Sequence, residues 1–362
     1  MKKHIGIVTF HCADNYGAFL QAYALQQWLK SNFDNNISIV NYCPDYLIDS
    51  YKIKLPINKN MKSLIIFLYE LPSKLKRVYR FKKARRKFNL SDKYKKSDNY
   101  YSYLILGSDQ IWNPEITNGI DEMYYGTFGG ENCQCISYAA SIGVNNFTIS
   151  QQKKLKKLMS NLKAISVREK TTITVLEPII KEKACLVCDP TFLLSKKEWT
   201  SVCHDVKYSN YIVIYQLFPN PAILQDAVGY AKKYNKSILI FNEPMIKNNY
   251  GVKIISVHGS GPFEFISIIK NADLVLTNSF HATCFSIIFQ KEFYTYLQEK
   301  RSQRIRDLAI EGDFLSHLVE YGNHLKLQKK LDFKVINHNL DDLIKNSKKF
   351  LYENLDIKGD IE

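Results

Sequence analysis

The sequence has 362 residues, of which 46% are hydrophobic, and it carries a net charge of +15. This length is too great for one typical hydrophobic core, so two domains of somewhat under 200 residues are expected. The composition is that of a globular protein and excludes a fibrous or disordered chain. No run approaches the roughly 18 apolar residues of a spanning helix, and the start lacks a signal-peptide core. We therefore expect a cytoplasmic protein.

The first half of the chain alternates short apolar runs with helical stretches, which is typical of parallel α/β proteins. Apolar residues recur at helical spacing over 18–30 and 150–162, so these stretches are predicted to be helices. The apolar runs predict strands at 4–10, 37–42, 103–107, 135–140, 164–168 and 185–189.

One segment of this half, residues 52–96, carries most of the charge. It holds 16 Lys and Arg against two acids, Glu70 and Asp92, so 14 of the net +15 lies here. Its cations alternate with apolar residues at helical spacing. Three interpretations stay open: a solvated helical insertion, a surface for anionic lipid or a lipid-linked substrate, and a nucleic-acid surface. Because no nucleic-acid-binding motif is recognisable, nucleic acid is not expected as a partner.

Eight cysteines are spread along the chain, and without a secretion signal we expect them to be reduced. Two close pairs, Cys133 with Cys135 and Cys185 with Cys188, have the number of ligands that a zinc site needs. Both pairs fall inside apolar, strand-like runs, so buried thiols are the favoured interpretation. No metal and no cofactor are expected.

The second half repeats the alternation and completes the predicted fold. Strands are predicted at 211–217, 237–241, 253–257, 272–278 and 292–297, and helices at 222–234, 262–269, 282–289 and 340–355. The fold class is α/β, with two doubly wound Rossmann-like domains joined near 195–209. The predicted domains are 1–200 with a basic helical insertion at 52–96, then 205–335, then a C-terminal helix and tail at 336–362.

Ligands of open α/β sheets bind beyond the carboxyl ends of the strands, so the residues after each strand are the candidates. After the first strand, Asn15, Tyr16 and Gly17 precede a helix whose N-terminus favours an anion or an acceptor. An empty helix cap is the alternative. After 103–106, Asp109, Gln110 and Trp112 combine an acid, an amide and an indole, which suits a sugar surface.

Two further places offer cations. Arg168 follows a strand directly, and a planar guanidinium there can grip phosphate or carboxylate at two points, or form a surface ion pair instead. Arg301, Arg304 and Arg306 follow the strand at 292–297 and can form an anion clamp.

His281 lies where the strand at 272–278 passes into a helix. A lone histidine most often has a structural role, but this position and the nearby Asn278 and Ser279 favour proton transfer, since imidazole both takes and gives a proton near pH 7. No nucleophile elbow, H-E-x-x-H motif or Walker A loop is present.

Taken in order, these motifs resemble those of the polysaccharide pyruvyl transferase family. The resemblance covers roughly residues 5–308 and includes "DNYGAFLQAYAL", "GSDQIWNP", "YAASIG", "SVRE", "DPTFLL" and "GPFEFISIIKNADLVLTNSFHATCFSIIF". It implies a GT-B-type arrangement with the active site in the interdomain cleft, the first domain on the acceptor side and the second on the donor side.

The resemblance also implies a bacterial enzyme that transfers pyruvate from phosphoenolpyruvate to a sugar of a cell-surface polysaccharide, such as a capsule or cell-wall glycan, or its lipid-linked precursor. The product is a ketal. Catalytic roles then fall to His281 and Asp109, and donor binding to Arg168, Ser279 and Arg304. Family members often have Arg-Leu-His where this chain has Ser279-Phe280-His281. The part of donor binding that this arginine performs is then expected to pass to Arg168 or Arg304.

Two other functions compete with this prediction. One is a GT-B glycosyltransferase that uses a nucleotide-sugar and therefore binds UDP or GDP. The other is a non-catalytic carbohydrate- or membrane-binding module, in which residues 52–96 dock on a membrane. Under the pyruvyl transferase prediction, the same segment holds the enzyme at the inner membrane surface.

Overall fold

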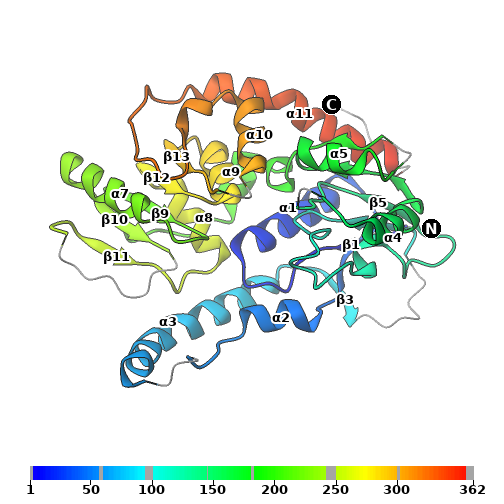
Figure 1. The fold of residues 1–362 in the computed structure, drawn as a ribbon, viewed down its shortest axis with the longest axis horizontal. Coiled ribbons are helices and arrows are strands. Elements are labelled where there is room, and N and C mark those ends of the chain that lie inside the picture. Colours follow the sequence, from blue (N-terminus) through cyan, green and yellow to red (C-terminus); the bar gives the residue numbers. More distant parts are fainter. Residues whose placement is uncertain are drawn as a thin grey trace. The chain divides into compact units, whose positions relative to one another are not determined.

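The computed structural model describes residues 3–56, 60–93, 101–144, 146–180, 183–241, 250–299 and 302–355. Its contacts divide the chain into two compact units, shown in Figure 1. The first unit comprises Met1–Tyr51, Lys87–Leu194 and His338–Glu362, and the second comprises Lys52–Arg86 and Ser195–Asn337. Among the described residues, none of the helices combines the length and hydropathy needed to cross a membrane.

The first unit is built on a six-stranded parallel sheet in the order β3-β2-β1-β4-β5-β6. The strands are β1 (His4–Val8), β2 (Asn36–Asn41), β3 (Leu90–Lys93), β4 (Tyr103–Leu106), β5 (Gln134–Ser137) and β6 (Leu162–Ala164). A small second sheet pairs β7 (Ser166–Val167) with β8 (Cys185–Leu186). The central strands are apolar and buried because a parallel sheet is covered on both faces.

The helices of the first unit are α1 (Tyr16–Asn32), α2 (Asp45–Tyr51), α4 (Ile149–Met159), α5 (Lys170–Leu176), the short η1 (Glu122–Tyr125) and η2 (Pro190–Leu193), and most of α11 (Phe333–Asn354). Local sequence explains several of their starts. Thr148 and Gln151 form a capping box at α4, and Asp189 accepts a hydrogen bond from the backbone N–H of Thr191 at η2.

The second unit repeats the same topology, with parallel strands in the order β11-β10-β9-β12-β13-β14. Its strands are β9 (Tyr211–Tyr215), β10 (Ser237–Ile240), β11 (Ile254–Ser256), β12 (Leu274–Thr277), β13 (Phe293–Tyr296) and β14 (Leu318–Val319). Its helices are α3 (Met61–Arg85), α6 (Lys196–Ser201), α7 (Pro221–Tyr234), α8 (Pro262–Lys270), α9 (Phe280–Phe289), α10 (Gln303–Gly312) and the short η3 (Leu315–His317).

The predicted fold class is confirmed: both sheets have the doubly wound order. Successive strands are added on one side of β1 and of β9, and then on the other side from β4 and from β12 onward, while all strands stay parallel. Each reversal creates a switch point at the carboxyl edge of a sheet. Two segments group differently from the predicted domains. The basic helix α3 belongs to the second unit, not the first, and the C-terminal segment from His338 belongs to the first.

Candidate active site

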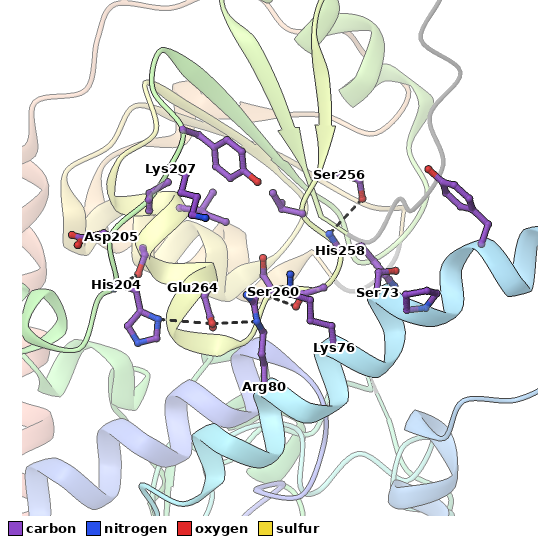
Figure 2. Close-up of a pocket in the computed structure, with 18 residues that line it drawn as sticks. Ser73, Lys76, Arg80, His204, Asp205, Lys207, Ser256, His258, Ser260 and Glu264 are labelled. Carbon is purple, nitrogen blue, oxygen red and sulfur yellow. Dashed lines mark hydrogen bonds and ion pairs between the residues drawn. The ribbon is translucent and has the colours of Figure 1, made fainter.

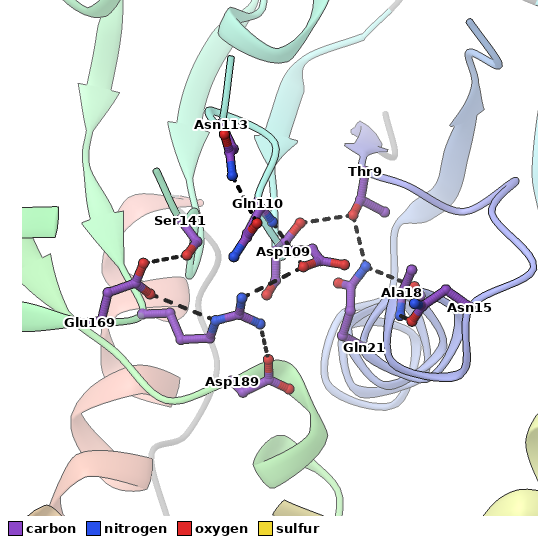
Figure 3. Close-up of polar contacts among 12 residues, drawn as sticks. Thr9, Asn15, Ala18, Gln21, Asp109, Gln110, Asn113, Ser141, Glu169 and Asp189 are labelled. Carbon is purple, nitrogen blue, oxygen red and sulfur yellow. Dashed lines mark hydrogen bonds and ion pairs between the residues drawn. The ribbon is translucent and has the colours of Figure 1, made fainter. Parts of the chain in front are cut away.

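The switch point of the first unit joins the ends of β1 and β4 through side chains. Thr9 follows β1, and its hydroxyl donates to the carbonyl of Ser108, which follows β4, at 3.0 Å. The amide nitrogen of Gln21 on α1 donates to the Thr9 hydroxyl at 2.8 Å and to the carbonyl of Ala18 at 2.9 Å. Figure 3 shows how this chain of contacts leads from α1 to Asp109. Helix α1 and the two loops are therefore joined by one buried hydrogen-bond network.

The predicted anion loop at the start of α1 is a capped helix end. The side-chain oxygen of Asn15 accepts a hydrogen bond from the backbone N–H of Ala18 at 3.1 Å, which marks Asn15 as the N-cap. Tyr16 has no exposed surface and Gly17 is buried. Tyr16 is therefore part of the core and does not offer its ring to a ligand, which corrects the predicted binding role of that residue.

Asp109 lies at the mouth of this switch point. Its backbone has φ of +78°, a conformation that costs free energy in a residue with a side chain. Next to it, Gly107 has φ of +125°, and a Cβ there would lie 2.3 Å from the carbonyl oxygen of Tyr138, so only glycine fits. The Asp109 side chain is 16% exposed, and one carboxylate oxygen lies 3.6 Å from Arg168. Asp109 is thus held firmly and can still be reached from outside.

Arg168 is the centre of a buried charge cluster. Its side chain is 1% exposed, and its guanidinium nitrogens lie 2.7 Å from the carboxylate of Asp189, 3.6 Å from Asp109 and 3.9 Å from Glu169. Burial alone would lower the pKa of the guanidinium, but the carboxylates of Asp189, Asp109 and Glu169 raise it above its usual value. Ser141 also donates to Glu169.

This arrangement bears on the predicted role of Arg168 in donor binding. Three carboxylates surround a single guanidinium, so the cluster as a whole is not a positive site that attracts a phosphate. The chemistry it supports is different: Arg168 orients Asp109, whose carboxylate can accept a proton from a hydroxyl group.

The indole of Trp112 does not form the predicted sugar platform. The residue is 2% exposed, its ring stacks on Tyr125 at a centroid distance of 5.7 Å, and its N–H donates to the carbonyl of Tyr124 at 3.0 Å. Gln110 is buried too, and its side-chain oxygen accepts from the amide of Asn113 at 2.9 Å. Both residues therefore stabilise the loop that carries Asp109, which corrects their predicted contact with a ligand.

The switch point of the second unit contains His281. Asn278 follows β12, and its side chain accepts from the backbone N–H of Leu217 and donates to the carbonyl of Phe218, both at 2.7 Å. These bonds tie the loop after β9 to the loop after β12. Ser279 caps α9 through its hydroxyl, and His281 lies in the first turn of this helix, 8% exposed. An imidazole is thus placed at a helix N-terminus, where the backbone N–H groups favour an anion.

One of the predicted clamp arginines lies beside this helix end. The guanidinium of Arg304 lies over the ring of Phe280, with its central carbon 5.7 Å from the ring centroid. Arg306 instead forms a fork with the carboxylate of Glu320, at 3.0 and 2.6 Å, so its charge is already compensated. Arg301 lies outside the described residues. In the second unit, Ser279 and His281 therefore lie at the start of α9, and Arg304 contacts Phe280, the residue between them in sequence.

The comparison with protein families identifies the family of the chain. Residues 15–300 match the sequence model of the family described as polysaccharide pyruvyl transferase. The chain belongs to the polysaccharide pyruvyl transferase family. The matched span includes Asn15, Asp109, Arg168 and His281, whereas Arg304 lies just beyond it. A search of curated proteins found no match.

Solved structures similar to this pyruvyl transferase family member are glycosyltransferases and epimerases of the GT-B type. A Listeria monocytogenes protein assigned as a UDP-N-acetylglucosamine 2-epimerase has a TM-score of 0.51 and 8% identity, over 96% of this chain and 89% of that one. The UDP-N-acetylglucosamine 2-epimerase of Rickettsia bellii has a TM-score of 0.47 and 12% identity, over 98% and 96%. At such identities the likeness concerns the fold alone, which is of the GT-B type.

Two residues of this pyruvyl transferase family member that sequence reasoning did not single out lie at the same edge of the first sheet. His11 follows β1, and its Nε2 lies 3.5 Å from the thiol sulfur of Cys43, which follows β2. The Nδ1 atom of His11 lies 3.2 Å from the carbonyl oxygen of Thr9, which accepts a hydrogen bond. In the sequence, the feature that could have identified this pair is that both residues follow predicted neighbouring strands.

Proposed function

We propose that this family member transfers pyruvate from phosphoenolpyruvate to two hydroxyl groups of a sugar and forms a cyclic ketal. The observation that carries the proposal is the second-unit site. His281, a side chain able to deliver a proton, lies at a helix N-terminus, and Arg304 lies over the ring of the preceding residue, Phe280. Phosphoenolpyruvate needs a proton donor, because protonation of its methylene carbon generates a cationic carbon. It also needs positive charge nearby, because its phosphate and carboxylate are anionic.

The atoms of the reaction balance without a further reactant. One proton adds to the methylene carbon of phosphoenolpyruvate, which becomes a methyl group, and a sugar hydroxyl attacks the neighbouring carbon. The bond from that carbon to the phosphate oxygen then breaks, phosphate leaves, and a second hydroxyl closes the ketal ring. The two hydroxyl protons replace the proton given to carbon and the proton taken by phosphate.

We assign donor handling to the second unit. His281 delivers the proton to the methylene carbon, while the start of α9 and Arg304 compensate the negative charge of the donor. Ser279 acts as the cap that fixes the start of this helix. Of the two arginines that the sequence left open for the donor, the proposal favours Arg304, because Arg168 is already surrounded by carboxylates.

Acceptor handling falls to the first unit in this proposal. The carboxylate of Asp109 accepts the hydroxyl proton of the sugar, and Arg168 is a positioning residue that fixes the direction of this carboxylate. The start of α1, capped by Asn15, gives backbone N–H groups to the same edge of the sheet. The acceptor is a sugar of a polysaccharide or of its lipid-linked precursor.

The direct test is mass spectrometry of reactions that contain the full-length enzyme, phosphoenolpyruvate and candidate glycans. We expect the glycan to gain about 70 mass units, the mass of pyruvic acid less one water, as the balanced reaction requires, while phosphate accumulates in equal amount. The matched reaction replaces phosphoenolpyruvate by UDP-N-acetylglucosamine. A glycan that gains a sugar in that reaction, and gains nothing from phosphoenolpyruvate, would establish a glycosyltransferase instead.

The basic helix α3 supports a second part of the proposal, a contact with an anionic membrane surface. A soluble helix normally buries its apolar face, but α3 exposes a stripe at the three- and four-residue spacing of a helix. The stripe consists of Met61, Leu64, Ile65, Leu68, Leu75 and Tyr79. Exposed cations on the same helix complement anionic headgroups, so we propose that α3 holds the enzyme at a membrane where lipid-linked sugars are found.

This contact predicts a salt-sensitive association with vesicles in a flotation assay. We expect binding to vesicles that contain phosphatidylglycerol. We expect Ile65→Asp with Leu68→Asp to weaken it by about tenfold or more, since apolar contact area is lost and two negative charges are added. The matched control is Ile149→Asp with Leu327→Asp, which alters two exposed apolar residues away from α3. Equal binding to neutral phosphatidylcholine vesicles would contradict the proposal.

A further inference from the structure

The second unit contains a cavity of about 500 Å³ that none of the assigned roles uses. Its walls come from α3, from residues 204–208, from the loop after β11 and from α8 (Figure 2). A volume of this size is typical of sites that bind a small organic molecule. The cavity involves neither His281 nor Arg304, so it is distinct from the proposed donor site.

The cavity exists because α3 is seated against the loop that follows β11. A Cβ at Gly259 would lie 3.2 Å from the backbone oxygen of Ser73, and a Cβ at Gly261 would lie 2.8 Å from Arg80. Glycine therefore permits the close approach of the helix. Arg80 fastens it, because its guanidinium donates to the carbonyl of Gly259 at 3.1 Å and lies 3.4 Å from the carboxylate of Glu264. The basic helix is thus a wall of this cavity as well as a surface feature.

The charges in the cavity are not balanced. Glu264 is shared by Arg80 and by His204, whose ring nitrogen lies 3.8 Å away. Lys76 on α3 and Lys207 on the 204–208 segment line the same cavity, and neither has a hydrogen-bond or ion-pair partner within the part of the chain that the structure describes. Asp205 lines it too, so Lys76, Arg80 and Lys207 face two carboxylates, and the lining keeps an excess of one positive charge. The two lysines lie on different walls and are available to a ligand.

The remaining lining suits a ligand with a polar head and an organic part. Burial and the charge of Arg77 lower the pKa of His258 to about 4, so its ring is neutral near pH 7. The buried Nδ1 of this ring has no hydrogen-bond partner among the described residues. Tyr69 and Tyr208 provide ring surfaces, and Ser256 provides a hydroxyl group. Such a mixture of aromatic walls and few polar groups is typical of binding pockets.

We propose that this cavity binds an organic diphosphate, the group through which a sugar is attached to a lipid or nucleotide carrier. Lys76 and Lys207 contact the phosphate oxygens from two sides, which favours an extended diphosphate over a single compact anion. The organic part lies against Tyr69 and Tyr208. Binding itself is independent of catalysis, whereas its meaning, that the acceptor arrives as a carrier-linked sugar, rests on the proposed function.

Isothermal titration calorimetry of the full-length enzyme tests this site without phosphoenolpyruvate. The probes are geranyl diphosphate, UDP and inorganic pyrophosphate. We expect at least one organic diphosphate to bind, and Lys76→Gln with Lys207→Gln to weaken it by about tenfold or more, the factor expected when charge-assisted contacts are lost. The control, Lys62→Gln with Lys82→Gln, removes the same charge from exposed positions of α3 outside the cavity and should leave the affinity unchanged.

The relative affinities identify the source of the ligand. Tighter binding of geranyl diphosphate indicates a lipid carrier, and tighter binding of UDP indicates a nucleotide. Pyrophosphate binding as tightly as both esters, equal losses in the two double variants, or no binding at all would overturn the proposal. Ketal formation is measured separately by mass spectrometry. If only this inference is wrong, ketal still forms but no diphosphate binds. If only the proposed function is wrong, diphosphate binds but no ketal forms.

Discussion

Replacing His281 by glutamine is expected to lower the rate of ketal formation by about 100- to 10,000-fold, the range for loss of a general acid. Glutamine keeps a polar side chain in the first turn of α9 but cannot deliver a proton to carbon. The affinity for phosphoenolpyruvate should change little, because the proposed function assigns donor binding to the start of α9 and to Arg304, which the substitution leaves in place. Single-turnover kinetics and calorimetric titration with phosphoenolpyruvate separate these two effects.

His338→Gln is the matched control for this change, because His338 is exposed on α11 and has no partner among the described residues. Its activity should equal that of the unmodified enzyme. If His281→Gln retained full activity on a working acceptor, the assignment of the proton donor would be refuted. If it lost donor binding and activity together, His281 would belong to the binding site and not to proton transfer.

Most of the fold could be predicted from the sequence because the central strands are continuous apolar runs. β1, β4, β9 and β12 have almost no exposed surface, so their local composition is sufficient to identify them. β3, β14 and most of β6 escaped prediction, and all three lie at sheet edges, where an apolar pattern is not required. Their pairing follows from the neighbouring strand and not from their own residues.

The place of the candidate residues in the fold could also be predicted, but the burial and contacts of individual side chains could not. Asp109 and His281 lie at the two switch points, as the rule for open sheets requires. Tyr16 and Trp112 also come after strands, yet both are buried. The indole N–H of Trp112, for example, donates to the carbonyl of Tyr124, which is twelve residues away in sequence. The residues next to Trp112 in sequence do not predict such a contact.

Long-range contacts explain the remaining differences. The basic helix lies in sequence between β2 and β3 of the first unit, but its Arg80 bonds to the carbonyl of Gly259, 179 residues away. Only the tertiary structure reveals that α3 belongs to the second unit. Arg168 is a similar case, since the pairing of β7 with β8 brings Asp189 beside it and changes a predicted phosphate ligand into the centre of an ion cluster.

Replacing Arg168 by methionine is expected to lower the free energy of unfolding by about 3–5 kcal/mol, because carboxylates would remain buried without their cation. The side chain is 1% exposed, and Asp189, its nearest partner, is fully buried. Urea unfolding followed by circular dichroism measures the loss. Arg306→Met is the control, since it breaks an exposed pair with Glu320 and should cost at most about 1 kcal/mol.

The double variant Arg168→Met with Asp189→Asn separates charge from packing. Asparagine keeps the oxygen that accepts hydrogen bonds from Thr191, so the start of η2 is preserved while one buried charge is removed. We expect this variant to recover part of the lost stability without recovering activity, because Asp109 would still lack the guanidinium that orients it. A positioning role also predicts that Arg168→Lys, once folded, lowers kcat more than it raises the KM for phosphoenolpyruvate. The opposite split would return Arg168 to the donor site, where the sequence placed it.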